Sequence, residues 1–509
     1  MPGKKTRIVR ALAVSMVVAT LAGQAAAQQT LDNPVGRFFD MPLDSGMLDN
    51  PGDVEQVVFS APVELEPAQW LRLYFAALEL PQGSSIRMTS LRDGEVQTLD
   101  ADAAQMWQNS SAYFNGNLVA VELVAGPRTV GNRLVLQRVA FDPKIQDRGE
   151  PGECGICDVD DRQPSTDLAS GRLMPAGCSA SVYCESGSLT SAGHCGAEGG
   201  VIQFNVPPSN SNCGLVNPPV ADQFPVTATT GVNQGVGADW RVIRTGINSQ
   251  GQTVQQRYNS FRRFAGTAAT TGSALQIFGY GIDRTCDRNQ VQQLSPGVIG
   301  PVGGNSYEFN NDVRGGNSGS GMVVNNFLVG VVTHCSPQCG NNLGTRGDKA
   351  DFRAARDAAC VPAFRLDVSA APSAPSVAIG VAPADINNMS NGTTLFSRTF
   401  FRGEQVTLTA PESNGNGVCF ASWTINGAVG GRDNAITLTI NANTTARANY
   451  SAAGCCPADY NRDGQGDFFD YLDFAQDYGT DAPAADFNRD GQVDFFDYLD
   501  YVAAFDRGC

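Results

Sequence analysis

The sequence predicts a mostly β protein of several domains that ends in a small α-helical module. The chain has 509 residues, and a single hydrophobic core rarely grows beyond roughly 250–300 residues, so more than one domain is expected. Its 56 glycines suit many short strands and turns better than long helices. Apolar and polar residues alternate in many segments, as in half-buried strands, whereas helical patterns are few and one helix face per repeat is expected at the end of the chain.

Residues 1–27 have the pattern of an export signal. A basic start precedes the apolar run "ALAVSMVVATLA", which is too short for a stable membrane anchor, and "QAAAQQ" offers small residues for cleavage after Ala27. No later stretch is apolar enough to span a membrane. We therefore expect a secreted, extracellular protein, with attachment to the cell surface left open.

Cysteines and charge narrow the protein class further. The chain holds 14 cysteines, an even number, and in an exported protein these predict disulfide bonds rather than metal thiolates. The pair in "CGIC", Cys154 and Cys157, is expected to form a loop bridge. The net charge is −16, which argues against nucleic acid or an anionic membrane as a partner.

Residues 28–148 are predicted to form a β-sandwich. In "WLRLYFAALEL", Leu71, Leu73 and Phe75 fall on one face of a strand, and Arg72 and Tyr74 on the other. No catalytic constellation is found here. The domain is either an accessory domain or a pro-domain, and its sequence does not distinguish the two.

Residues 149–366 carry the candidate catalytic residues. A nucleophilic serine needs a base, and the base needs an orienting carboxylate. The chain has only two histidines: His194 lies in "LTSAGHC" and His334 in "FLVGVVTHC". Asp239 follows His194 in "GVGADWRVIR", with Asp222 as a conceivable substitute, and Ser318 lies in "NNDVRGGNSGSG".

These three segments, in this order, closely resemble trypsin-like (chymotrypsin-fold) serine proteases. The resemblance covers about 200 residues and implies a double β-barrel, serine endopeptidase activity on protein or peptide substrates, and no catalytic cofactor. It implies a triad of His194, Asp239 and Ser318, with the backbone N–H groups of Gly316 and Ser318 as the oxyanion hole. It also implies a disulfide between Cys178 and Cys195.

Residues near Ser318 suggest the specificity and the activation of the site. Asp312 lies six residues before Ser318, the offset of the acidic pocket floor in trypsin, which implies a preference for Arg or Lys together with Thr333 on the pocket wall. The same motif also resembles glutamyl endopeptidases, for which His334 is a candidate. Asn317 replaces an aspartate that many family members pair with a new N-terminus, so we expect the site to form without that switch.

A linker and a second β domain follow. "SAAPSAPS" marks residues 367–376 as a linker. Alternation at Val406 and Leu408, and again from Ile436 to Ile440, predicts a small β-sandwich over residues 377–452. Its "CFASWTINGAVGG" resembles the F-x-x-W-x-x-x-G heart of repeat domains in bacterial surface proteins.

Residues 453–509 contain a duplicated motif with the spacing of a calcium loop. "ADYNRDGQGDFFDYLDF" at Ala458 recurs as "ADFNRDGQVDFFDYLDY" at Ala485. Calcium takes 6–8 oxygen ligands, and we expect one ion in each copy, bound by oxygen atoms at matched positions. The first set is Asp459, Asn461, Asp463, Gln465 (through its carbonyl), Asp467 and Asp470, and the second is Asp486, Asn488, Asp490, Gln492 (carbonyl), Asp494 and Asp497.

Because the carboxylates of an empty loop would repel one another, each ion is expected to fold its loop. Position 12 is Asp and no helix precedes the first loop, so the module resembles dockerins rather than calmodulin-like EF-hands. That resemblance implies docking to a cohesin-like partner or the cell surface. Each copy continues into a predicted helix, with one face formed by Phe469, Leu472 and Ala475 or by Phe496, Leu499 and Val502; "FFDYLD" fits a contact face or a core equally well.

Three functions fit these features. The leading one is a secreted serine endopeptidase with a calcium-dependent docking tail. The alternative is a non-catalytic protease-fold adhesion or scaffold protein anchored by the same tail. A carbohydrate-cleaving enzyme lacks support, because no paired-carboxylate site is found outside the calcium loops.

Overall fold

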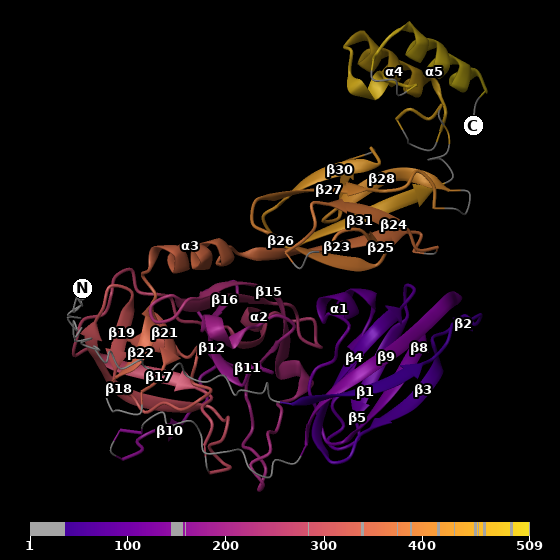
Figure 1. Cartoon of the computed structure of the whole chain (residues 1–509). Helices are drawn as coiled ribbons and strands as arrows, with labels where there is room; N and C mark the ends of the chain where they lie inside the picture. Colours follow the sequence, from indigo (N-terminus) through magenta and orange to yellow (C-terminus); the bar gives the residue numbers. More distant parts are fainter. Residues whose placement is uncertain are drawn as a thin grey trace, which may run out of the picture.

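A computed structural model describes most of the chain after the expected signal sequence, which lies outside the described residues. The described ranges are 36–143, 156–157, 159–283, 285–336, 341–373, 375–386, 389–414, 418–431, 433–451, 456, 458–461, 465–488 and 492–507. The protein is mostly β (Figure 1). Within these ranges no helix is long and apolar enough to cross a membrane.

The first domain consists of two antiparallel sheets that face each other across a core of buried apolar side chains. One sheet has the order β1-β9-β4-β7 with β2 paired to β9, and the other has the order β3-β8-β5-β6. On β4, Leu71, Leu73 and Phe75 are buried as the alternation predicts. The bounds are β1 Arg37–Asp44, β2 Leu48–Asn50, β3 Gln56–Glu64, β4 Ala68–Glu79, β5 Ser85–Ser90, β6 Val96–Leu99, α1 Ala101–Met106, β7 Phe114–Asn115, β8 Leu118–Ala125 and β9 Thr129–Pro143.

The second domain begins with a closed barrel of six antiparallel strands in the order β11-β12-β13-β16-β15-β14. Strands β11, β12, β13 and β14 are short and wholly buried, whereas β15 has 11 residues and is buried only in its first part. The bounds are β11 Ser170–Met174, β12 Cys178–Val182, β13 Leu189–Ser191, η1 Gly193–Cys195, β14 Val201–Gln203, η2 Val220–Asp222, β15 Gln223–Asn233, β16 Asp239–Thr245 and α2 Val254–Tyr258.

A second ring of six strands follows, in the order β18-β17-β20-β21-β22-β19, and it closes because β19 also pairs with β18. The short strand β10 adds to its β18 edge. After this barrel, helix α3 returns to the first one, where Phe352 stacks on Trp240 with ring centroids 5.0 Å apart. The bounds are β10 Gln163–Pro164, β17 Ala274–Gly279, β18 Gln293–Val302, β19 Ser306–Phe309, β20 Gly321–Val324, β21 Phe327–His334, β22 Asn342–Arg346 and α3 Ala350–Ala359.

The third domain is a smaller sandwich of a five-stranded and a four-stranded sheet around the buried Trp423. Strand β23 runs through Leu366 and Asp367, so this domain begins at Ala363, where the sequence still predicts the protease domain and then a linker. The bounds are β23 Ala363–Ala371, β24 Ala378–Ala382, β25 Gly392–Thr393, β26 Phe396–Phe401, β27 Glu404–Thr409, β28 Cys419–Ile425, β29 Ala428–Gly431, β30 Ala435–Ile440 and β31 Thr444–Ser451.

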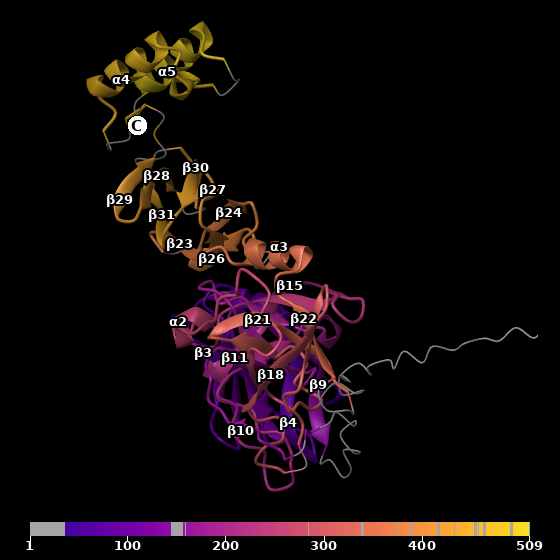
Figure 2. The ribbon, with the colours of Figure 1, turned by 90° about the vertical axis from the view of Figure 1, so that its left-hand side faces the viewer.

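The terminal module contains two helices, α4 (Phe468–Gly479) and α5 (Phe495–Arg507), with the short η4 (Pro483–Ala485) between them. They pack through aromatic rings, and Phe474 stacks on Tyr501 with centroids 4.0 Å apart. Figure 2 shows this module and the third domain extending beyond the rest of the protein.

The first domain and the first barrel share one hydrophobic core. Met174, Val201, Leu215 and Val220 of the protease domain belong to the same buried cluster as the sandwich side chains. The polar face of β4 is therefore not turned to solvent: Arg72 is 2% exposed, and its guanidinium donates to the carbonyl of Gly199 at 3.0 Å. The two domains lie side by side in Figure 1.

Candidate active site

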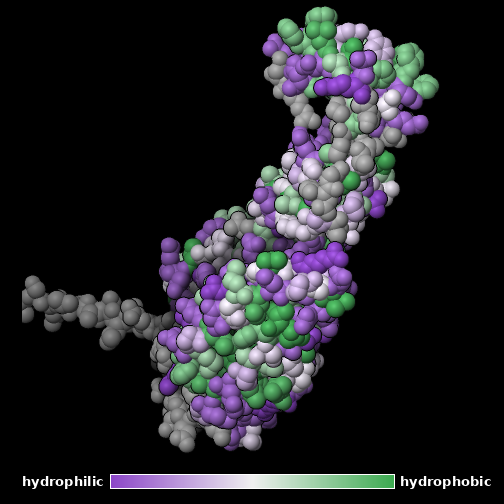
Figure 3. Space-filling view, turned by 90° about the vertical axis from the view of Figure 1, so that its right-hand side faces the viewer, coloured by the Kyte–Doolittle hydropathy of each residue, from purple (hydrophilic) through white to green (hydrophobic). Residues whose placement is uncertain are grey.

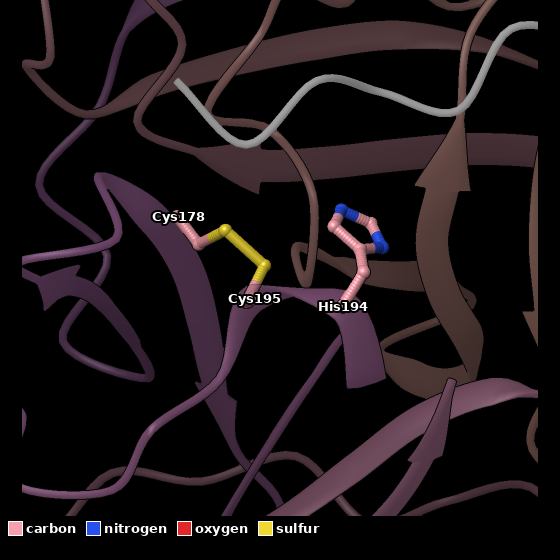
Figure 4. Close-up of side chains that lie close together, drawn as sticks. All are labelled: Cys178, His194 and Cys195. Carbon is pink, nitrogen blue, oxygen red and sulfur yellow. A yellow bond between two sulfur atoms is a disulfide. The ribbon is translucent and has the colours of Figure 1, made fainter. Parts of the chain in front are cut away.

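His194 is held by a tight turn of the first barrel. It lies in η1, directly after β13, and Cys195 beside it forms a disulfide with Cys178 of β12 (Figure 4). This confirms the disulfide that the protease resemblance implies. Gly193 permits the turn, because a side chain there would overlap the carbonyl oxygen of Val232.

Asp239, the first residue of β16, lies behind the imidazole. One carboxylate oxygen accepts the backbone N–H of His194 at 2.9 Å, and the other lies 2.6 Å from its Nδ1. Asp239 is 1% exposed. Two bonds to the same residue fix the rotation of the ring and place its remaining nitrogen, Nε2, away from the acid.

Asp222, the other candidate acid, has different partners. Its carboxylate accepts from Arg257 and from the hydroxyl of Tyr258, and Asn205 donates to it as well. The structure therefore pairs His194 with Asp239, and Asp222 fastens α2 and the β14–β15 region instead.

Ser318 lies on the turn between β19 and β20, pressed against the first barrel. Its carbonyl accepts the N–H of Ser179 at 2.8 Å and lies 3.8 Å from the sulfur of Cys195. The next residue, Gly319, donates its N–H to Val332 of β21. The serine turn is thereby clamped between both barrels beside the residue that follows His194.

Gly316 has a backbone conformation that favours glycine. Its φ is +95°, and an added side chain would meet the carbonyl of Tyr280 and the amide of Gln290 at 2.5 Å each. The hydroxyl of Ser179 donates to its carbonyl at 2.8 Å. The positive φ and the lack of space for a side chain therefore both require glycine at this position of the turn.

Asn317 closes the same turn without a charge. Its Oδ1 accepts the N–H of Arg314 at 2.9 Å, while its own N–H donates to the carbonyl of Arg314 at 3.0 Å. These two bonds hold the turn with an uncharged side chain at this position.

Asp312 is buried, and backbone groups bind both of its carboxylate oxygens. Its two oxygens accept the backbone N–H groups of Cys157 (2.5 Å) and Asp161 (3.1 Å), and the residue is 3% exposed. Burial raises the pKa of its carboxyl group. The residue thus fastens the segment that enters the protease domain, and the preference for Arg or Lys that its offset implies stays a prediction.

Thr333 and His334 lie at the end of β21. The hydroxyl of Thr333 donates to the carbonyl of Leu343 at 3.2 Å and lies 2.9 Å from Nδ1 of His334. The rings of His334 and His194 are neighbours, with centroids 6.3 Å apart. From the sequence, His334 is expected to be either a wall residue or a pocket residue; its closeness to His194 has no sequence signal beyond the rarity of histidine in this chain.

Cys178, His194 and Cys195 place three potential metal-ligand atoms within 4.8 Å of one another. Both sulfurs are consumed by the disulfide, and a metal needs the thiolate form of cysteine. This trio is therefore a structural clasp, as the bond drawn in Figure 4 indicates.

The loops of the terminal module are closed by the carboxylate at position 12. Asp470 accepts the N–H groups of Asn461 and Asp467 at 2.8 Å each, and Asp497 does the same for Asn488 (3.0 Å) and Asp494 (2.8 Å). Two of the twelve expected ligands, Asp463 and Asp490, lie outside the described residues.

The predicted helix face of this module is at the surface rather than in its core. Phe469 is 65% exposed and Phe496 is 64% exposed, and the core uses Phe474, Ala485 and Tyr501 instead. Figure 3 shows hydrophobic surface at this end of the molecule.

Two closed six-stranded β-barrels, with the His194–Asp239 pair and the Ser318 turn at their junction, are consistent with a chymotrypsin-like fold. No family model and no curated protein matches the chain. Among solved structures it is similar to a Glu endopeptidase in complex with MPD, with a TM-score of 0.32 and 19% identity over 40% of this chain and 97% of that one. It is also similar to a mutant of human heparin binding protein, with a TM-score of 0.30 and 10% identity over 39% of this chain and 95% of that one.

Proposed function

We propose that the protein is a secreted serine endopeptidase with a calcium-dependent docking tail. The observation that carries the proposal is the pair of hydrogen bonds that Asp239 accepts from the backbone N–H and from Nδ1 of His194, beside the clamped serine turn. Disulfides suit an oxidising compartment, and none of the described cysteines is free.

Each side chain has a defined task in the proposed reaction. The hydroxyl of Ser318 attacks the peptide carbonyl, and Nε2 of His194 accepts its proton and later delivers it to the leaving amine. Asp239 holds the proton on Nδ1 and stabilises the charged imidazolium. The N–H groups of Gly316 and Ser318 bind the oxyanion, and each such donor contributes about 3–4 kcal/mol to transition-state stabilisation in related enzymes.

A fluorophosphonate probe tests this function directly. We expect the probe to label the full chain at Ser318, and we expect Ser318→Ala and His194→Ala to abolish the label, because the hydroxyl is unreactive without its base. Mass spectrometry of the labelled peptide identifies the site.

Ser320→Ala serves as the matched control, since this neighbouring serine is just as buried but lies beyond Gly319. An unlabelled wild-type chain that folds normally would instead favour the alternative, a non-catalytic protease-fold scaffold.

The terminal module supports the docking role. Its donors are hard oxygen atoms with the spacing that calcium prefers, and the residues present therefore fit two calcium ions. The ions would hold the loops in place so that α4 and α5 stay paired. Six apolar side chains are exposed in two equivalent sets, Phe468, Phe469 and Leu472 on α4 and Phe495, Phe496 and Leu499 on α5, and they offer a surface for a cohesin-like or cell-surface partner.

Calcium removal is expected to unfold this module and leave the protease intact. With excess chelator, trypsin should release the tail, while the labelling of Ser318 should stay unchanged. Asp470→Asn should raise the calcium concentration needed for protection by about tenfold or more, because position 12 is a ligand. Asp481→Asn, at an exposed acidic residue outside the ligand set, is the control. If trypsin spares the tail of the wild type, of Asp470→Asn and of Asp481→Asn equally in the absence of calcium, the proposal is contradicted.

A further inference from the structure

The only two histidines of the chain lie together in the candidate active site. His194 belongs to the first barrel and His334 ends β21 of the second, yet their rings are 6.3 Å apart between centroids and tilted by 59°. The fold thus brings the two imidazole side chains of this protein close together.

Both rings are held in the tautomer that binds metals. Asp239 accepts a hydrogen bond from Nδ1 of His194 at 2.6 Å. The hydroxyl of Thr333 donates its own hydrogen to Leu343, so it accepts from Nδ1 of His334 at 2.9 Å. With both protons on Nδ1, each Nε2 carries the free lone pair, and this is the arrangement by which outer oxygens orient metal-ligating histidines.

The Nε2 atom of His194 is buried, and it has no hydrogen-bond partner among the residues that the structure describes. At tetrahedral angles, zinc–nitrogen bonds of about 2.0–2.1 Å place the centroids of two imidazole ligands roughly 5–5.5 Å apart. The observed separation of 6.3 Å is longer, so the two rings have to approach each other by about 1 Å to hold one ion.

We propose that Nε2 of His194 and Nε2 of His334 bind a transition-metal ion of the zinc class, with water in the remaining positions. Imidazole favours such ions over calcium, which prefers oxygen ligands. The bound ion would occupy the lone pair that must accept the proton of Ser318. Zinc therefore inhibits the peptidase reversibly, and this consequence rests on the proposed function. The binding of the metal does not rest on that function.

The test uses the full chain with its tail saturated by calcium, and zinc chloride alone as the probe. Zinc should slow the labelling of Ser318 by fluorophosphonate, and a chelator selective for zinc should restore it. His334→Gln removes one ligand, so the zinc concentration for half-inhibition should rise about 10- to 100-fold or more, with each variant compared to its own metal-free rate. Magnesium chloride is the control salt.

Equilibrium dialysis separates this proposal from the peptidase assignment. The Ser318→Ala chain, which needs no activity, should bind one more zinc ion than the Ser318→Ala, His334→Gln chain at equal calcium. Equal zinc binding by the two chains, or equal inhibition of the wild type and His334→Gln, overturns the metal site. If the wild type is never labelled, the peptidase assignment fails, and dialysis alone decides the metal site.

Discussion

Asp239→Asn should lower kcat by about 10⁴-fold and change KM little. The carboxylate now accepts two hydrogen bonds from His194, one from the backbone and one from Nδ1. An asparagine amide can direct its NH₂ group at Nδ1, which moves the imidazole proton to Nε2, so that the ring can no longer accept the proton of Ser318. In serine proteases this single change costs about four orders of magnitude while the geometry stays intact.

Asp222→Asn is the matched control for this prediction. Asp222 is also buried, at 5% exposure, but its partners are Arg257 and Tyr258. Its loss should lower thermal stability and leave kcat near the wild-type value. Rates of hydrolysis of a fluorescent protein substrate, measured together with melting curves, distinguish the two. Comparable kcat values for Asp239→Asn and the wild type would show that a different acid supports the base.

Local motifs predicted the parts of the site that each depend on one short segment. His194 and Ser318 lie in turns where close contacts require glycine, as at Gly193 and Gly316. A short motif around each residue therefore already shows the turn that positions it. For the acid partner of His194, the strand pattern that follows Asp239 favours it over Asp222 in the sequence, and only the closed barrel shows which of the two contacts the imidazole.

Roles set by distant backbone groups could not be predicted in this way. Asp312 has the offset of a pocket floor, but N–H groups from some 150 positions earlier occupy its oxygens. The exposure of Phe469 and Phe496 was likewise ambiguous, since apolar spacing on a helix marks a face without saying what covers it. The polar face of β4 was misleading as well. Polar residues such as Arg72 suggest a face open to solvent, but the protease domain buries this face.

A chain that begins at residue 149 is expected to be insoluble or unfolded, because the first domain is an integral partner of the protease barrel. Removing it would expose Met174, Val201, Leu215 and Val220, four apolar side chains of the shared core. Burying one such side chain is worth about 1.5–3 kcal/mol, so the four together approach the whole stability of an ordinary domain, about 5–15 kcal/mol.

Buried polar groups add to this dependence. The amide of Gln223, which is wholly buried, pairs with both the N–H and the carbonyl of Tyr113 at 2.9 Å each. Asn115 makes a similar pair with the backbone of Asn217. Without the first domain these groups lose their partners, and an unsatisfied buried group costs about 1–3 kcal/mol. These contacts favour a permanent accessory domain over a pro-domain that is shed.

Two measurements test this expectation. Cutting the intact chain at a protease site inserted between residues 148 and 149 should leave the two pieces associated in gel filtration, with labelling of Ser318 retained, whereas the piece expressed alone should aggregate. Gln223→Leu should lower the melting temperature by several degrees, while Gln234→Leu, at an exposed position, should not. A soluble, labelled chain beginning at residue 149, or dissociation of the cut pieces without loss of labelling, would instead identify the first domain as a removable pro-domain.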